Sequence, residues 1–311
     1  MLPLNDMVFF VEVVKYNSFT IAAQKNNITP AAISKRISSL EEILQVKLLK
    51  RTTRSLALTE AGKVLYQHCQ NMQLDIQNII ETVQQTHQRP RGKIKIAALQ
   101  NVSNLIIAPL IDAFLQLYSD IEVFITFEGA LGPLPPIGEY DIAFRSGKLI
   151  DSSAIARLLF THQYTVCASP AYLNRYGVPL SLEDLKNHNC LDCISGLKDE
   201  KKVWLFNDGQ QNYAISVKGN IHTNNALLVK NLALNNAALI YSPTFIVAEE
   251  INAGKLIPVL CQYKTHENSI FIIHPYTSQN IPVRVKTFID FVFGNIKVPA
   301  IFQKKLMEII T

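Results

Sequence analysis

The 311-residue chain is long enough for two or three domains, each able to bury a core of its own. Hydrophobic residues make up 48% of it and charged residues 18%, as in ordinary globular proteins. No apolar run approaches the roughly 20 residues needed to cross a bilayer. The apolar N-terminus contains Asp6 and Glu12 without a following cleavage site, so it does not resemble a signal peptide. The sequence excludes a membrane-spanning protein and predicts a cytoplasmic one.

The net charge of +5 is concentrated at one end of the chain. Residues 1–92 contain 11 Lys and Arg against 7 Asp and Glu, whereas residues 93–311 contain 19 against 18. A basic cluster confined to one region favours a polyanionic partner such as nucleic acid, with a merely solvated face as the alternative.

Three short helices are predicted near the N-terminus. Apolar residues recur every three or four positions between Leu4 and Val14, which gives a helix one apolar face. Ser18 is placed to cap a second helix. Thr29 followed by Pro30 predicts the start of a third, because a hydroxyl caps the free N–H groups and proline suits the first turn.

The third helix has two different faces. Four apolar side chains, spaced four, three and four residues apart, are expected to point inward: Ile33, Ile37, Leu40 and Leu44. The opposite face is small, polar and cationic, which suits a helix laid in the major groove of DNA. The residues expected to contact DNA from this helix are Thr29, Pro30, Ala31, Ser34 and Lys35.

A basic hairpin is predicted to follow. Leu56 and Leu58 alternate with polar or small residues, as in a short strand. Arg51 and Arg54 are expected near the hairpin tip, where they can neutralise phosphates or enter the minor groove. Three helices and such a hairpin form an all-α winged helix-turn-helix, with a small helical subdomain that has a basic edge as the alternative.

A long helix is expected from Thr59 to about His87, a stretch with no proline and one glycine. Its apolar residues are spaced alternately four and three apart, the heptad seam that pairs helices in a coiled coil. The seam consists of Leu65, Cys69, Met72, Ile76, Ile79 and Val83. We expect this helix to dimerise two chains, the alternative being an amphipathic helix lying on its own core. Pro90 and Gly92 then indicate a hinge.

From Lys93 onward, apolar strands alternate with helical stretches. Strands are expected at residues 94–96, 121–127, 140–144, 164–168, 238–241 and 269–274. Helices are expected at residues 105–118, 171–176, 243–252 and 284–293. The alternation predicts mainly parallel sheets covered on both faces. We expect two α/β lobes, joined by crossing segments around 160–165 and 264–269, with a ligand cleft at the carboxyl ends of the strands.

Strings along most of the chain resemble the LysR-type transcriptional regulators. In the first sixty residues they are FFVEVV (Phe9–Val14), NSFTIAA (Asn17–Ala23), TPAAIS (Thr29–Ser34), LEE (Leu40–Glu42), VKLLKRTTR (Val46–Arg54) and LTEAG (Leu58–Gly62). Beyond the hinge they are GKIKI (Gly92–Ile96), YDIAFR (Tyr140–Arg145), CASPAYL (Cys167–Leu173) and PTFIVA (Pro243–Ala248). The resemblance implies a winged helix-turn-helix, a dimerising linker helix and a two-lobed effector domain similar to periplasmic solute-binding proteins.

The resemblance also implies positions for ligand contacts. The family pattern places them on the loop after the first strand, here Gln100, Asn101 and Ser103, whose donors suit an anionic group. Arg145 could bind a carboxylate at the end of its strand, and Asn224 faces the cleft from the second lobe. An anionic small-molecule effector is therefore one candidate. Helix capping by the first three residues, and a surface ion pair for Arg145, are the alternatives.

Two segments depart from the family pattern. Glu128–Glu139 is shorter than usual, and residues 234–240 lack the glycines usual at that turn, so the pocket could differ in shape or bind nothing.

The sequence shows no metal-binding or catalytic motif. Cys190 and Cys193 form a lone CxxC without a second ligand pair, so we expect no metal and two mostly buried thiols. The commonest catalytic motifs are absent, and no cofactor is expected.

The sequence therefore predicts a DNA-binding transcriptional regulator, modulated by a small-molecule effector and assembled as a dimer or tetramer. An architectural DNA-binding oligomer without an effector is the first alternative, and a two-lobed α/β enzyme is the second. The expected domains are residues 1–60 (DNA-binding), 61–92 (linker helix and hinge) and 93–311 (effector-binding), the last with lobes of 93–162 plus 268–311 and of 163–267.

Overall fold

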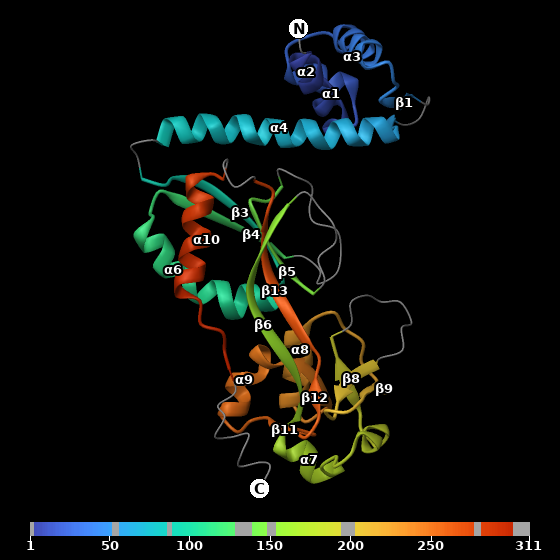
Figure 1. Cartoon of the computed structure of the whole chain (residues 1–311), viewed down its shortest axis with the longest axis vertical. Coiled ribbons are helices and arrows are strands. Elements are labelled where there is room, and N and C mark those ends of the chain that lie inside the picture. Colours follow the sequence, from blue (N-terminus) through green and yellow to red (C-terminus); the bar gives the residue numbers. More distant parts are fainter. Residues whose placement is uncertain are drawn as a thin grey trace. The chain divides into compact units, whose positions relative to one another are not determined.

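The computed structural model describes residues 3–51, 56–85, 89–127, 139–147, 154–193, 203–276 and 281–300. The chain folds into two compact units, and the main boundary between them falls between Gln88 and Arg89 (Figure 1). It lies a few residues before position 92, where the sequence predicts the hinge to end. None of the helices in these ranges has both the length and the apolar character needed to cross a membrane.

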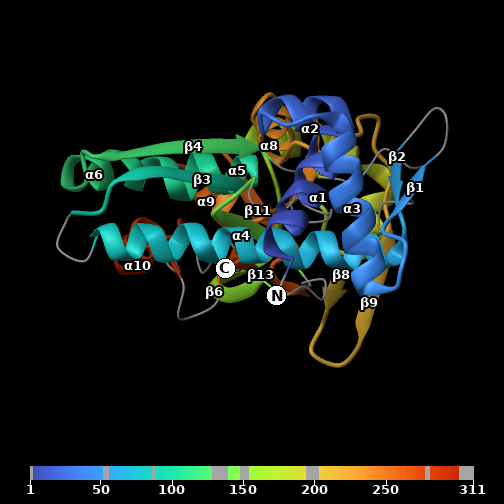
Figure 2. The same ribbon diagram turned by 90° about the horizontal axis from the view of Figure 1, so that it is seen from above.

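The N-terminal unit consists of three short helices, a hairpin and one long helix. Its elements are α1 (Leu4–Tyr16), α2 (Phe19–Lys25), α3 (Pro30–Leu44), β1 (Leu49–Arg51), β2 (Leu56–Leu58) and α4 (Glu60–Gln85). In both Figure 1 and Figure 2 the short helices and the hairpin gather over the first half of α4, and the second half extends beyond them. This is the predicted winged helix-turn-helix followed by its long helix.

Local side-chain chemistry sets the ends of the short helices. Ser18 Oγ accepts a hydrogen bond from the N–H of Ile21 at the start of α2, and Thr29 Oγ1 accepts one from Ala32 at the start of α3, both at 3.2 Å. α1 ends at Asn17, whose φ of 48° is left-handed and stops the helix. The core beneath these helices comprises Phe10, Val13, Ala22, Ala23, Ile33, Ile37, Leu40, Leu48 and Leu49.

The second unit contains one large sheet, one small sheet and flanking helices. The large sheet comprises β3 (Gly92–Ala98), β4 (Ile121–Phe127), β5 (Ile142–Ser146), β6 (Ile155–Ala168), β7 (Cys190–Asp192), β10 (Leu239–Pro243), β11 (Ile257–Val259) and β13 (Glu267–His274). The small sheet comprises β8 (Val203–Asn207), β9 (Asn212–Ser216) and β12 (Lys264–Thr265). The helices are α5 (Gln100–Val102), η1 (Ser103–Ile107), α6 (Ala108–Leu117), α7 (Pro170–Tyr176), η2 (Leu182–Asn187), α8 (Ala226–Leu234), α9 (Thr244–Asn252) and α10 (Val283–Asn295).

The large sheet is mixed, so the expectation of mainly parallel sheets was wrong. Its order is β4-β3-β5-β13-β6-β10-β7, with β11 also paired to β6. The β3–β4, β3–β5 and β7–β10 pairs are parallel, whereas every pair that β6 and β13 make is antiparallel. β6 and β13 run side by side from one half of this unit to the other (Figure 1). The two halves therefore share one continuous sheet.

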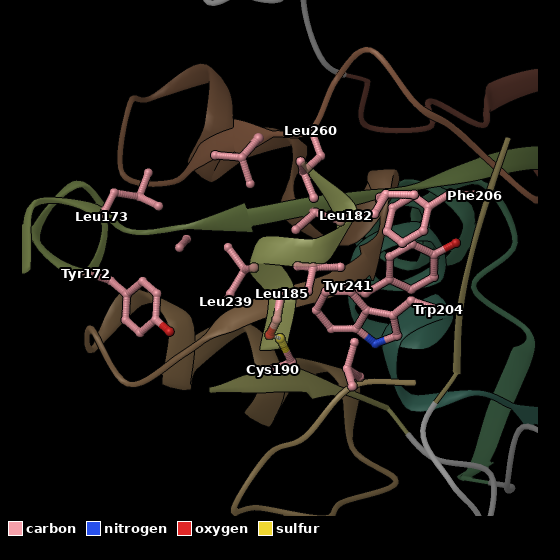
Figure 3. Packing of buried hydrophobic residues seen from close by; sticks show 14 residues of the cluster. Tyr172, Leu173, Leu182, Leu185, Cys190, Trp204, Phe206, Leu239, Tyr241 and Leu260 are labelled. Carbon is pink, nitrogen blue, oxygen red and sulfur yellow. Dashed lines mark hydrogen bonds between the residues drawn. The ribbon is translucent and has the colours of Figure 1, made fainter. Parts of the chain in front are cut away.

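An aromatic stack joins the small sheet to the large one. The ring of Trp204, fully buried on β8, stacks on Tyr241 of β10 with centroids 5.3 Å apart and planes at 19°. Figure 3 shows the two rings side by side within the buried cluster. Tyr241 stacks on Tyr164 at 4.9 Å, and Tyr164 on His266 at 4.3 Å. We call these four residues the ring column.

Candidate functional site

The exposed face of α3 carries the residues predicted to contact DNA. The side chains of Thr29, Pro30, Ala31 and Lys35 are exposed and that of Ser34 is half-buried. The opposite face supplies Ile33, Ile37 and Leu40, which are all 0% exposed. The helix therefore has one face fixed in the core and one free to enter a groove.

Two neighbouring cations on α3 have different roles. Arg36 forms an ion pair with Asp6 at 3.0 Å, and its guanidinium lies 5.1 Å from the ring centroid of Phe9. It therefore ties α3 to α1. Lys35 makes no ion pair with any side chain in the described ranges, so its ammonium is available to a ligand.

A buried carboxylate anchors the base of the hairpin. Glu41 is only 6% exposed, and its Oε1 accepts hydrogen bonds from the N–H groups of Leu48 at 2.9 Å and Leu49 at 3.2 Å. Its Oε2 accepts one from Lys47 Nζ at 2.7 Å. Burial by itself raises the pKa of Glu41, but these hydrogen bonds outweigh it and hold the pKa below its ordinary value. The carboxylate thus fixes where the chain leaves α3 and enters β1.

The start of α4 is held against the residues just before β1. Thr59 Oγ1 donates to the carbonyl of Lys47 at 2.6 Å and accepts from the N–H of Gly62 at 2.9 Å. A Cβ on Gly62 would lie 2.1 Å from the carbonyl oxygen of Leu48, so only glycine fits there. The LTEAG string was noted in the sequence, but the anchoring roles of Glu41 and Gly62 were missed, because they depend on contacts with the hairpin.

The remaining DNA-binding and dimerisation predictions are only partly covered by the structure. Arg54 and the side chain of Arg51 lie outside the described residues.

The predicted heptad seam of α4 has two parts. Leu65 packs on the N-terminal core and Cys69 is buried, whereas Ile76 and Ile79 are 48% and 53% exposed. Met72 is half-buried, and the side chain of Val83 is not described. The exposed part is where a second helix could pack.

The second unit contains a partly open cavity of about 510 Å³. Its polar lining side chains are Gln100, Asn101, Ser146, Asp192, Asn224 and Asn225. Its aromatic lining side chains are Phe127, His162, Tyr164, Tyr241, Phe245 and His266. A wall of rings with a few convergent polar groups is typical of small-molecule sites.

Three of the predicted ligand residues, Gln100, Asn101 and Asn224, line this cavity. A residue that the sequence analysis missed, Asn225, joins its two sides: Asn225 Nδ2 donates to Gln100 Oε1 at 3.2 Å. Asn225 Oδ1 also accepts from the N–H groups of Leu227 and Leu228, each at 3.0 Å, and so caps α8. An asparagine directly before a helical run was the available signal for it.

Ser103 and Arg145 are not part of the described wall. Ser103 lies buried at the start of η1, two residues after Asn101 of the cavity lining. Arg145 is 6% exposed on β5, so it is not a surface residue either, and the next residue, Ser146, lines the cavity. Because successive side chains of a strand point to opposite faces, Arg145 points away from the ligand space.

The described wall includes two histidines and one aspartate. Burial lowers the pKa of His162 to about 4, although a hydrogen bond to the carbonyl of Gln163 opposes it. Burial also lowers the pKa of His266, so both rings are neutral. Asp192 is the only acidic side chain on this wall, which carries no Lys or Arg among the residues described. Its Oδ2 accepts a hydrogen bond from Trp204 Nε1 at 3.2 Å.

The two cysteines of the CxxC have separate surroundings. Cys190 is fully buried, whereas Cys193 is exposed at the cavity wall, so the expectation of two buried thiols holds for only one. Although part of the Cys193 residue is exposed, desolvation of its thiol by the surrounding protein, reinforced by the Asp192 carboxylate, raises its pKa to about 11. No group of three metal-ligating side chains occurs within the ranges that the structure covers.

Both units match models of one protein family. Residues 4–63 match the bacterial regulatory helix-turn-helix protein, lysR family, and residues 87–295 match the LysR substrate binding domain. The HTH-type transcriptional activator AaeR of Escherichia coli is 31% identical over 288 residues, which are 92% of each chain.

Solved structures agree with these matches. The full-length virulence activator AphB of Vibrio cholerae is 29% identical, with a TM-score of 0.62 over 94% of this chain and 99% of that one. CrgA of Neisseria meningitidis is 28% identical, with a TM-score of 0.59 over 93% and 97% of the two chains. This chain, with its helix-turn-helix unit and its substrate-binding unit, therefore belongs to the LysR-type family of transcriptional regulators.

Proposed function

We propose that this regulator binds a specific DNA site, in the cytoplasm, through the exposed face of α3. The observation that carries the proposal is the division of α3 into a core face and an exposed face that begins at a capped N-terminus. Ala31 is small enough to permit approach to base edges, and Lys35 can reach a base acceptor or a phosphate. Arg51 and Arg54 of the hairpin would add phosphate or minor-groove contacts.

A dimer would place two copies of α3 on two half-sites. α4 has 26 residues and is therefore about 39 Å long, enough to carry a pairing surface beyond the short helices. Ile76, Ile79 and Ile80 expose about half of their side chains there. Apolar side chains at this spacing favour pairing with a second α4.

A small molecule in the cavity would modulate DNA binding. The Gln100–Asn225 hydrogen bond joins the two halves of the second unit at the cavity edge, so a ligand there would favour one spacing of these halves over another. A ligand that binds one arrangement better shifts the population toward it. The cavity favours this reading over an architectural protein without an effector.

The side chains of the wall do not favour an enzyme. Cys193, with its raised pKa, stays a thiol at neutral pH, and a thiol is a poor nucleophile. His162, with a pKa of about 4, is a weak base at neutral pH.

The DNA-binding face is tested by measuring affinity for the DNA flanking the gene at several salt concentrations. Lys35→Ala and Arg51→Ala should each weaken binding by about tenfold, and a lost phosphate contact should reduce the salt slope by about one. Lys286→Ala is the matched control, because it removes one exposed positive charge from α10. Unchanged affinity in both test variants, or an equal loss in the control, would refute the assigned face.

A further inference from the structure

The N-terminal end of α3 follows a short turn. Residues 26–28 join α2 to α3, and Thr29 then caps α3. Asn27 has a left-handed φ of 55°, which turns the chain out of the direction of α2. Ile28 lies half-buried against the N-terminal core, and its N–H donates to the carbonyl of Ala23 at 3.1 Å. The position of Thr29 and of the residues after it therefore depends on how this turn is held.

A polar pair ties the turn to α1. Asn26 Nδ2 donates to the carboxyl oxygen Oε2 of Glu12, which lies 14 residues earlier on α1. The same Nδ2 donates to the carbonyl of Ala22, inside α2, at 2.8 Å. Glu12 and Asn26 are both half-buried. One side-chain amide thus joins α1, α2 and the turn that leads into α3.

The helix that carries Glu12 is fixed in the core. Two of its residues, Phe10 and Val13, are 0% exposed. The middle of α3 is tied to the same helix by the ion pair between Arg36 and Asp6 at 3.0 Å. α1 therefore holds α3 at its middle through this ion pair, and it holds the turn before α3 through Glu12.

We propose that Glu12 is a positioning residue for sequence recognition: by holding Asn26, it sets where the N-terminal end of α3 lies in the major groove. Base edges are read by hydrogen bonds that need exact geometry, whereas phosphate contacts carry no sequence information. Displacement of this end of α3 should therefore weaken binding to the correct site more than binding to other DNA. The inference rests on the proposed function, since Glu12 acts through the helix that is proposed to contact DNA.

The test measures the affinity of the full-length chain for its footprinted site and for scrambled DNA of the same length, over a range of salt concentrations. In Glu12→Ala the ratio of the two affinities should fall by about tenfold, the loss expected for one misplaced base contact. The salt slope with scrambled DNA should be unchanged, because the cations that meet phosphates are retained.

Glu12→Gln is the matched control. It makes the same change of formal charge, but it keeps a side-chain oxygen that can accept from Asn26, so it should keep the affinity ratio of the unaltered chain. Asn26→Ala removes the same hydrogen bond from the other side, so adding Glu12→Ala to it should cause no further loss. The amide of Ile28 should also exchange faster in Glu12→Ala than in Glu12→Gln, a readout that needs no DNA.

The inference is overturned if Glu12→Ala keeps the affinity ratio, if Glu12→Gln loses as much, if the losses of Glu12→Ala and Asn26→Ala add, or if exchange at Ile28 is unchanged. If Glu12→Ala does not fold, the affinity ratio in Asn26→Ala decides in the same way. Weaker binding in Lys35→Ala together with an unchanged ratio in Glu12→Ala would leave the proposed function standing and this inference refuted. An unaltered chain that prefers no DNA site would refute both.

Discussion

The anchoring of the hairpin by Glu41 gives a quantitative prediction for Glu41→Gln. Glu41 Oε1 accepts two backbone hydrogen bonds, from Leu48 and Leu49, and the amide oxygen of glutamine can keep both. What is lost is their charge-assisted character, worth about 1 kcal/mol for each bond. Lys47 is 76% exposed, so the ion pair adds at most about 1 kcal/mol. The expected cost is therefore about 2 kcal/mol from the two backbone hydrogen bonds, with at most about 1 kcal/mol more from the ion pair.

Hydrogen exchange of the amides of Leu48 and Leu49 measures this loss at the site itself. A cost of about 2 kcal/mol corresponds to exchange about 30-fold faster, if these amides exchange through local opening. Glu42→Gln is the matched control, because Glu42 is the next residue and is exposed. Equal exchange in Glu41→Gln and the unaltered chain would refute the assigned anchor, as would an equal change in the control.

The stability difference between Glu41→Gln and the unaltered chain should depend on pH, and the sign of that dependence follows from the pKa of Glu41. The folded pKa of Glu41 is held below its ordinary value of 4.5, so the unfolded chain binds the proton more readily. The stabilisation by Glu41 is therefore fully present above about pH 4.5 and is lost as the pH falls through the folded pKa. The difference between Glu41→Gln and the unaltered chain should shrink over that acidic range.

Two further predictions concern close packing and a buried histidine. Gly62→Ala should destabilise the N-terminal unit by about 1–3 kcal/mol despite the better helix propensity of alanine, because its Cβ meets the carbonyl of Leu48. Gly294→Ala on α10 meets nothing within 4 Å and should be neutral or stabilising by up to about 1 kcal/mol; equal thermal melting shifts in the two variants would contradict the contact. For His162, the lowered folded pKa means that stability of the second unit is lost as the pH falls from 6.5 toward about 4, by about 3 kcal/mol in all. His162→Phe should flatten this slope in denaturant titrations at several pH values, and an unchanged slope would rule out His162 as its source.

The N-terminal unit could be predicted from sequence because its signals are local. Thr29 and Pro30 mark the start of α3, and the spacing of Ile33, Ile37 and Leu40 defines its buried face; the structure confirms both. Such patterns depend on helix geometry within a few residues of chain. The anchors Glu41 and Gly62 could not be found this way, since their partners belong to the hairpin.

The cavity was only partly predictable because strand faces were ambiguous. Four of the five residues of β5 are buried, so no alternation showed that Ser146, rather than Arg145, faces the ligand space. Similarly, β6 changes from exposed to buried along its 14 residues, and only its end was predicted as a strand.

Asp192 shows a different limit of sequence reasoning. Its segment attracted attention only for the CxxC, whereas its position in the cavity follows from the pairing of β7 with β10, about 50 residues further along the chain. Pairing between distant strands has no local signal, because the connection between them can have many lengths.

Footprinting of the full-length chain on the DNA flanking its own gene tests the central claim most directly. The account predicts two protected half-sites whose centres lie about one helical turn of DNA, or a multiple of it, apart, because paired α4 helices would present two copies of α3. Protection should be lost in Lys35→Ala and kept in Lys286→Ala. No protection at any salt concentration, or a single isolated site, would contradict the account of a dimeric DNA-binding regulator.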